Sequence, residues 1–244
     1  MLPVQGNDTI RIMMNSPLKW IFFDVGETLV DESEPIEDIT RQLIAAAGRR
    51  GIAVSRGHVR ELWMEAHKRF SPFPMADILQ TLFPDAALRQ AIWSEMKYRK
   101  ELDRPFPESR GILERLSSRY RIGVIANQSA GTADRLRSYG LLEHIDEVFA
   151  SAELGLVKPD PKLYEYALNS AGCTAAETLM VGDRIDNDII PAKHLGMRAL
   201  WVRQGLALRQ YSPSKISEPD GIIDSICELE HWLHEWQNGS ADSP

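Results

Sequence analysis

Apolar runs typical of buried β-strands alternate with helical patterns through most of this 244-residue chain. The predicted strands cover residues 20–23, 121–127, 146–151, 178–183, 198–202 and 221–224. Helical periodicity marks residues 133–139, 161–171 and 188–195, and a last amphipathic helix carries Ile226, Leu229 and Trp232. Repeated βα units of this length favour an α/β fold built on a doubly wound parallel sheet.

One stretch departs from this alternation. Between residues 34 and 103 the apolar period becomes helical, with further helices predicted at 58–70 and 88–98 and no convincing strand. We therefore expect a small all-α domain at 34–103, inserted into a core domain formed by 17–33 and 104–238. The ends, 1–16 and 239–244, are predicted to be flexible, and Met13 and Met14 are alternative candidates for the true start.

Charged residues stand in three segments that a parallel sheet would bring together. Asp24 ends an apolar run in FFDVGETL, Lys158 precedes a proline in ELGLVKPDPKLY, and LMVGDRIDND carries Asp183, Asp186 and Asp188. Open α/β sheets bind ligands beyond the carboxyl ends of their strands, so we expect these side chains to share a pocket. Carboxylates suit Mg²⁺, an ammonium group neutralises phosphoryl oxygens, and a carboxylate can attack phosphorus.

The order of these motifs, from Trp20 to the final helix, resembles that of the haloacid dehalogenase superfamily. The resemblance implies that Asp24 is the nucleophile and forms an aspartyl-phosphate. It also implies that Asp24, the backbone carbonyl of Gly26 and Asp183 bind Mg²⁺, and that Lys158 holds nucleophile and phosphate in place. The helical insertion then corresponds to the family's cap domain.

Two further acidic residues are less clearly assigned by the resemblance. Asp188 fits the family's second acidic position, where it either completes the outer shell of the metal or caps the helix that starts there. For Asp186 the alternative is simple solvation.

Two residues depart from the pattern of family phosphatases. Gly26 stands where these enzymes have a second aspartate that protonates the leaving alkoxide, a contribution of roughly 10² to 10⁴ in rate. Glu27 is an uncertain substitute acid, because neighbouring loop residues generally point in different directions. Ala126 stands where the family usually has a serine or threonine that binds a phosphoryl oxygen. Asn127 and the loop that begins at Gln128 are the remaining candidate donors.

The leading hypothesis is a Mg²⁺-dependent phosphatase that acts on a small phosphorylated molecule. The loss of an acid at Gly26 predicts a preference for good leaving groups, such as aryl phosphates, acyl phosphates and phosphoanhydrides. One alternative is an attenuated pseudoenzyme that binds Mg²⁺ and phosphate or a nucleotide. A weaker alternative is a metal-free 2-haloacid dehalogenase, but that branch has a tyrosine at the position of Gly26, and the Asp183 to Asp188 cluster argues against it.

Five residues of the helical insertion are candidates for contacting substrate, namely Trp63, His67, Arg69, Phe70 and Phe73. Aromatic residues at helical spacing are more often part of a helix core than of a binding site. The residues alone allow a role in substrate binding or a role in the core of the helical domain.

The composition of the chain argues against nucleic-acid and membrane partners. A net charge of −7 with scattered basic residues argues against a nucleic-acid surface. No apolar run approaches the roughly 20 residues of a membrane span, and the start of the chain lacks a signal-peptide core. Cys173 and Cys227 have no metal or redox spacing and suit a reducing compartment. We expect a cytoplasmic protein without nucleic-acid or membrane partners, either a monomer or a homodimer.

Overall fold

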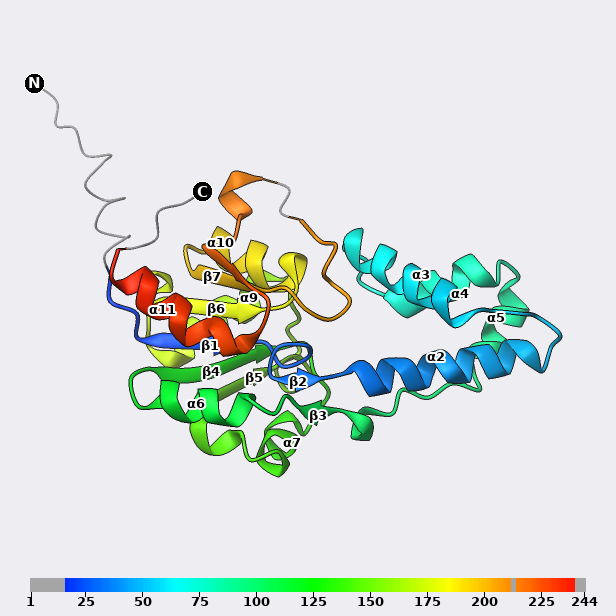
Figure 1. The fold of residues 1–244 in the computed structure, drawn as a ribbon, viewed down its shortest axis with the longest axis horizontal. Helices are drawn as coiled ribbons and strands as arrows, with labels where there is room; N and C mark the ends of the chain where they lie inside the picture. The colour runs from blue at the N-terminus through cyan, green and yellow to red at the C-terminus, as the bar shows by residue number, and fades with distance from the viewer. Residues whose placement is uncertain (1–15, 212–213, 240–244) are drawn as a thin grey trace, which may run out of the picture.

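A computed structural model describes residues 16–211 and 214–239. Its main sheet has six parallel strands in the order β5-β4-β1-β6-β7-β8 (Figure 1). These strands are β1 Trp20–Phe23, β4 Arg121–Ala126, β5 Glu147–Ala150, β6 Thr178–Gly182, β7 Arg198–Val202 and β8 Gly221–Ile223. The predicted parallel α/β class is confirmed. The termini predicted to be flexible lie outside the described residues, apart from Ser16 and Gly239.

Helices cover both faces of the sheet. On one face pack α6 Ser109–Ser117, α7 Thr132–Ser138 and α11 Leu229–Gln237, and on the other α9 Pro161–Ala171 and α10 Ile190–His194. The central strand β1 contributes side chains to the apolar clusters on both faces of the sheet. Ile21 and Phe23 belong to one cluster, whereas Trp20 and Phe22 belong to the other. This period of two on a fully buried strand explains why its sequence is continuously apolar.

Short helices complete the core. They are α8 Ser151–Leu154, η2 Leu142–His144, η3 Ala175–Glu177, η5 Lys215–Ser217 and η6 Ile226–Glu228. Among the residues that the structure describes, no helix is both long and apolar enough to cross a membrane.

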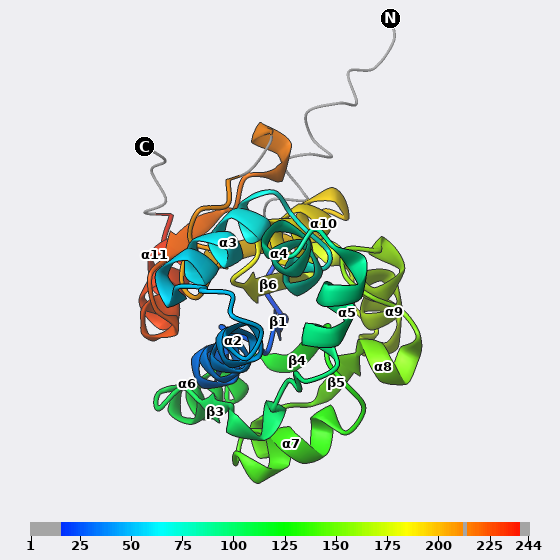
Figure 2. The same cartoon turned by 90° about the vertical axis from the view of Figure 1, so that its right-hand side faces the viewer.

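A small all-α unit, the segment expected to be the cap, stands beside the carboxyl edge of the sheet (Figures 1 and 2). Its helices are α2 Ser33–Gly48, α3 Arg56–Lys68, α4 Pro74–Leu82 and α5 Ala86–Trp93, followed by the turn η1 Lys100–Leu102. They enclose an apolar cluster of their own, which includes Leu43, Ile78 and Phe83. The domain boundaries expected at 33/34 and 103/104 stay a prediction.

The chain enters and leaves the cap through a two-stranded antiparallel sheet that was not predicted. Val30 of β2 (Val30–Asp31) pairs with Pro105 of β3 (Arg104–Pro105). Strands of two residues are too short for an alternating pattern to reveal them.

Two predicted helices end or begin elsewhere. The helix expected over 88–98 stops at Trp93, because the backbone of Lys97 bonds instead to the side-chain amide of Gln42. The helix expected over 188–195 becomes α only at Ile190, after a wider π-helical turn, η4 Ile185–Ile189. Asp188 distorts this turn, because its Oδ2 accepts a hydrogen bond from Arg184 N at 3.0 Å.

Gly123 on β4 offers a test of the core packing. A Cβ at this position would lie 2.4 Å from the ring of Phe22, so we expect Gly123→Ala to destabilise the protein by about 2 kcal/mol through overpacking. Urea unfolding at unchanged m-value measures the loss. The matched control is Gly57→Ala on α3, where a Cβ meets nothing within 4 Å and the change is expected to be neutral or slightly stabilising. Equal changes in the free energy of unfolding for the two substitutions would contradict the close contact between Gly123 and the Phe22 ring.

Candidate active site

Three adjacent strands end at the site. Asp24 follows β1, Asn127 follows β4 and Asp183 follows β6, with β1 between the other two. The register places Phe23 opposite Val124 and Val181, so the residues after these strands meet at one edge of the sheet. Topology therefore collects side chains that are far apart in the sequence.

Three carboxylates converge at this edge. Asp24, Asp183 and Asp188 each offer an oxygen, and these oxygens all lie within 4.8 Å of one another. All three residues are buried. Backbone geometry supports the cluster, because a Cβ at Gly182 would lie 2.4 Å from Asp188 Cγ, so only glycine allows Asp188 to pack there. Trp201 Nε1 donates to the backbone oxygen of Asp183 at 2.7 Å and holds that residue in place.

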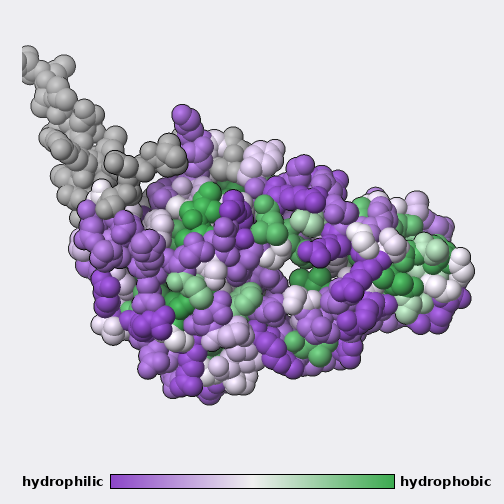
Figure 3. Space-filling view, in the orientation of Figure 1, coloured by the Kyte–Doolittle hydropathy of each residue, from purple (hydrophilic) through white to green (hydrophobic). Residues whose placement is uncertain are grey.

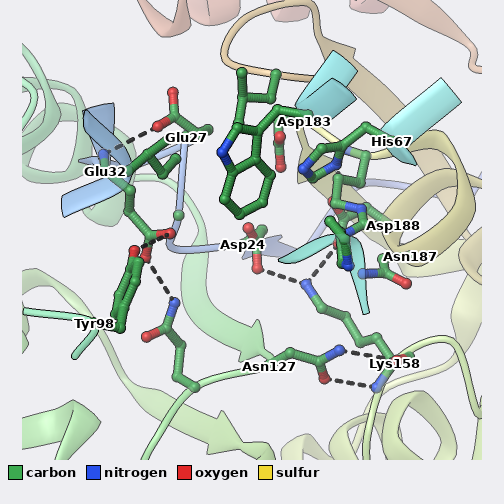
Figure 4. Close-up of a pocket in the computed structure, with 17 residues that line it drawn as sticks. Asp24, Glu27, Glu32, His67, Tyr98, Asn127, Lys158, Asp183, Asn187 and Asp188 are labelled. Carbon is green, nitrogen blue, oxygen red and sulfur yellow. Dashed lines mark hydrogen bonds and ion pairs between the residues drawn. The ribbon is translucent and has the colours of Figure 1, made fainter. Parts of the chain in front are cut away.

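Lys158 reaches the cluster from the loop between α8 and α9. Its Nζ donates to Asp24 Oδ1 at 2.5 Å, to Asp188 Oδ1 at 2.6 Å and to the backbone oxygen of Ile125 at 2.9 Å (Figure 4). The ammonium group therefore uses all three of its hydrogens. It fixes the orientation of the carboxylate predicted to be the nucleophile.

The site carries more negative than positive charge. Burial opposes the charged form of Lys158, but the carboxylates of Asp188 and Asp24 raise its pKa above the ordinary value. Burial, with repulsion from Asp188 and Asp24, raises the pKa of Asp183 well above its usual range. Burial likewise raises the pKa of Asp188 to about 6, against the pull of Lys158. One ammonium cannot balance three buried carboxylates, and clustered oxygen ligands of this kind suit a divalent cation.

Asn127 fixes the loop that carries Lys158. Its Oδ1 accepts from Lys158 N at 2.7 Å, and its Nδ2 donates to the backbone oxygen of Lys158 at 2.9 Å. The side chain predicted to bind a phosphoryl oxygen is thus engaged with the lysine loop. Gln128 is also engaged, since Glu32 accepts from its amide at 3.3 Å and Arg135 donates to its oxygen at 2.7 Å.

Glu27, the uncertain acid, occupies a left-handed backbone conformation with φ of 52°. Its Oε1 accepts from the backbone N–H of Glu32 at 3.0 Å. Burial, with repulsion from Asp31 and Glu32, raises the pKa of Glu27 to about 7. Figure 4 shows its carboxylate turned away from Asp24.

The acidic residues after β6 differ in part from expectation. Asp186 is not simply solvated: it forms an ion pair with Arg184 at 2.5 Å and accepts from Gln210 Nε2 at 2.8 Å. Asp188 does not cap the helix that follows it. Its carboxylate closes the preceding turn through Arg184 N and pairs with Lys158, which it can do because it points back toward β6.

The pocket lies between core and cap and has a volume of about 260 Å³. The space-filling view shows a hollow where the two domains meet (Figure 3). Trp63 and His67, stacked one helical turn apart on α3, both line it. Trp63 Nε1 and His67 Nδ1 are buried without a protein partner among the described residues. By contrast, Arg69 and Phe73 are exposed outside the pocket, and Phe70 packs against the core domain.

Several site residues gave no signal in the sequence. Glu32 lines the pocket from the start of the cap, although it lies outside the motif around Asp24. Trp201 stands on β7 outside any motif, yet its indole nitrogen anchors Asp183. Gln210, in an irregular loop, bonds to Ile185 N at 2.7 Å and to the backbone oxygen of His67 at 2.8 Å. Contacts between distant segments leave no local pattern, so a motif search cannot find them.

Comparison with known proteins assigns the family. The model of the haloacid dehalogenase-like hydrolases matches residues 21–202. The chain belongs to this family. A glyceraldehyde 3-phosphate phosphatase of Methanothermobacter thermautotrophicus is 28% identical over 228 residues, which cover 88% of this chain and 100% of the relative.

Solved structures share the family fold. A predicted phosphoglycolate phosphatase from Haemophilus somnus superposes with a TM-score of 0.67 at 20% identity, covering 88% of this chain and 98% of its own. The putative hydrolase YfnB from Bacillus subtilis, solved bound to magnesium, gives a TM-score of 0.61 at 18% identity, covering 90% and 100%.

His67 predicts a pH dependence of stability. Burial, together with the positive charge of Arg184, lowers the pKa of His67 to about 4. The unfolded chain takes up a proton on this residue below about pH 6.5, whereas the folded chain does not until about pH 4, so stability falls as pH decreases across that window. In wild type this proton uptake lowers the free energy of unfolding by up to about 3 kcal/mol between pH 6.5 and pH 4. We expect that contribution to be absent in His67→Gln.

Urea unfolding at intervals from pH 8 to pH 4 measures the effect of His67→Gln. His231→Gln, at an exposed position on α11, is the control and should keep the wild-type slope. Parallel stability curves for wild type and His67→Gln would contradict the buried neutral imidazole.

Proposed function

We propose that the protein is a Mg²⁺-dependent phosphatase that acts on a small phosphorylated molecule through an aspartyl-phosphate at Asp24. The observation that carries this proposal is the position of the Lys158 ammonium group. It donates hydrogen bonds to both Asp24 and Asp188 inside an acidic cluster. A buried lysine in this position orients a carboxylate nucleophile and faces the negative charge of a phosphoryl group.

The donor set fits magnesium. Asp24 and Asp183, with the backbone carbonyl of Gly26, would bind the ion directly. Asp188 would contact the groups bound to the ion and not the ion itself. When bound, Mg²⁺ would neutralise carboxylate and phosphoryl charge and so make phosphorus more electrophilic.

The protein's own residues account for the rest of the proposed first step. A carboxylate oxygen of Asp24 attacks phosphorus, and the bond from phosphorus to the leaving oxygen breaks. Lys158 orients the carboxylate of Asp24 for this attack through the hydrogen bond from its ammonium group. Asn127 keeps Lys158 in place through its two bonds to the lysine backbone. Since Ala126 has no hydroxyl, phosphate binding then rests on Lys158 and on the backbone N–H groups of Ser129 and Ala130. The N–H groups on either side of these two donate instead to Ser151 Oγ and Glu153 Oε1.

The cap side of the pocket suits the rest of the substrate. A volume of about 260 Å³ limits it to a small molecule. The unpartnered Trp63 Nε1 is a donor that is costly to leave unsatisfied, so it favours a substrate with a hydrogen-bond acceptor beyond the phosphate. Relatives of this chain include a glyceraldehyde 3-phosphate phosphatase, which is compatible with a small polar substrate.

A second candidate is a pseudoenzyme that binds Mg²⁺ and phosphate or a nucleotide without turnover. Gly26 and Ala126 favour it, because each lacks a side chain that family phosphatases use. The intact cluster of Asp24, Lys158 and Asp183 favours catalysis, since a binding protein does not require a nucleophile. The same cluster disfavours a metal-free dehalogenase.

The first test of the proposal uses Asp24→Asn. We expect wild type to release phosphate from acetyl phosphate and p-nitrophenyl phosphate only with Mg²⁺, and we expect the variant to lose at least about 10³-fold in rate because the nucleophile is gone. Asp134→Asn, at a largely exposed aspartate on α7, is the control and should keep full activity. Magnesium binding without release from any substrate would favour the pseudoenzyme.

The second test concerns Trp63→Phe, which keeps the ring and removes the donor. We expect kcat/KM for glycerol 3-phosphate to fall about threefold to tenfold relative to phenyl phosphate, the usual value of one hydrogen bond. Steady-state kinetics on both substrates measures the ratio. An equal change for both would mean that the indole nitrogen does not contact the substrate.

A further inference from the structure

Glu32 fills the space beside Gly26. A Cβ built on Gly26 would lie 2.9 Å from Glu32 Cδ and 3.0 Å from both of its carboxylate oxygens. An aspartate at position 26 would carry its carboxyl carbon only one further carbon–carbon bond away, roughly 1.5 Å. Depending on its rotamer, that carboxyl carbon would lie about 1.4 to 4.4 Å from Glu32 Cδ, so the Glu32 carboxylate stands next to the place where family phosphatases have their acid.

The loop after β1 explains how a residue six positions later reaches this place. Glu27 N donates to Val30 O at 2.7 Å, and Val30 N donates to Val25 O at 2.8 Å, so the chain curls back on itself. Gly26 and Val30 form a parallel bridge. The chain that follows β2 consequently passes Gly26 as it enters the cap.

The contacts of Glu32 hold its carboxylate at the pocket. Tyr98 Oη donates to Oε2 at 3.4 Å, and Gln128 Nε2 donates to Oε1 at 3.3 Å. Lys100 Nζ lies 3.6 Å from Oε1. Figure 4 shows the Glu32 carboxylate beside the hydroxyl of Tyr98. Its side chain is 19% exposed, which leaves it open to the pocket.

Glu27 is less well placed for the same task. Its carboxylate accepts the backbone N–H of Glu32, and its Oε2 lies 2.8 Å from where a Cβ on Gly205 would stand. It therefore faces the loop after β7, whereas Glu32 faces the space beside Gly26.

We infer that Glu32 is the general acid and base of this site, a catalytic residue supplied from the start of the cap in place of the aspartate missing at position 26. This inference rests on the proposed phosphatase function. As the bond from phosphorus to the leaving oxygen breaks, the Glu32 carboxyl gives its proton to that oxygen, which departs as an alcohol. The Glu32 carboxylate then takes a proton from water, whose oxygen attacks phosphorus. The bond to Asp24 breaks, inorganic phosphate leaves, and Glu32 is protonated again.

Glu32→Gln separates the two steps. With glycerol 3-phosphate, a poor leaving group, we expect the first step to slow by about 10² to 10⁴-fold. With p-nitrophenyl phosphate we expect the rapid burst of p-nitrophenol to persist within about threefold, because that leaving group needs no proton. Later turnover should slow, and intact-protein mass spectrometry should show one added phosphoryl group. Glu34→Gln, at an exposed glutamate in the first turn of α2, two residues after Glu32, is the matched control and should behave as wild type.

A rescue experiment tests the shared space directly. Gly26→Asp alone should not raise the hydrolysis of glycerol 3-phosphate, because the Glu32 carboxylate already occupies that volume. Gly26→Asp combined with Glu32→Gly should recover at least about tenfold over Glu32→Gly alone, since an acid returns to the same place. Thermal unfolding of each variant establishes that it is folded.

The outcomes are distinguishable. If Glu32→Gln slows the p-nitrophenol burst and the hydrolysis of glycerol 3-phosphate by the same factor, or slows neither, the inference is overturned. The phosphatase proposal then still stands. A wild-type protein without Mg²⁺-dependent release from any of these substrates overturns both. Loss of the alkyl reaction with a preserved burst, together with rescue by the double variant, supports the role of Glu32.

Discussion

The structure of the site depends on the Lys158 ammonium group, which lies between two buried carboxylates. Placing Asp24, Asp183 and Asp188 together without a cation would be strongly unfavourable. Burial first, and then repulsion from Asp188 and Asp24, raises the pKa of Asp183 well above its usual range. Lys158 offsets part of the repulsion, and its position is in turn set by Asn127. The remaining negative charge is what favours a divalent cation and a phosphoryl group.

Much of this arrangement could be predicted because it follows from topology. Asp24 and Asp183 each come directly after an apolar strand, and parallel strands that lie side by side end at the same edge. The sequence pattern contains both facts. The helical character of the cap could likewise be predicted from its apolar period, and its helices do enclose a separate apolar cluster.

What could not be predicted arises from contacts between segments. The π-helical turn over Ile185–Ile189 depends on where the Asp188 carboxylate points, and Asn127 proved to bond to a backbone 31 residues away. Glu32 is the clearest case. The absence of an aspartate at position 26 is visible in the sequence, but the carboxylate beside Gly26 becomes visible only once the loop has curled back. A residue elsewhere in the chain can thus supply a missing side chain at the same place in space. Motif comparison does not detect such a replacement.

We propose that Asp24, Lys158 and Asp183 form one site for a divalent ion and a phosphoryl group. A crystal structure grown with Mg²⁺ and beryllium fluoride, a mimic of an aspartyl-phosphate, tests it most directly. We expect the ion at about 2.1 Å from oxygens of Asp24 and Asp183, the beryllium on Asp24, and Lys158 in contact with a fluoride. An ion bound elsewhere, or a Lys158 side chain turned away from Asp24, would contradict it.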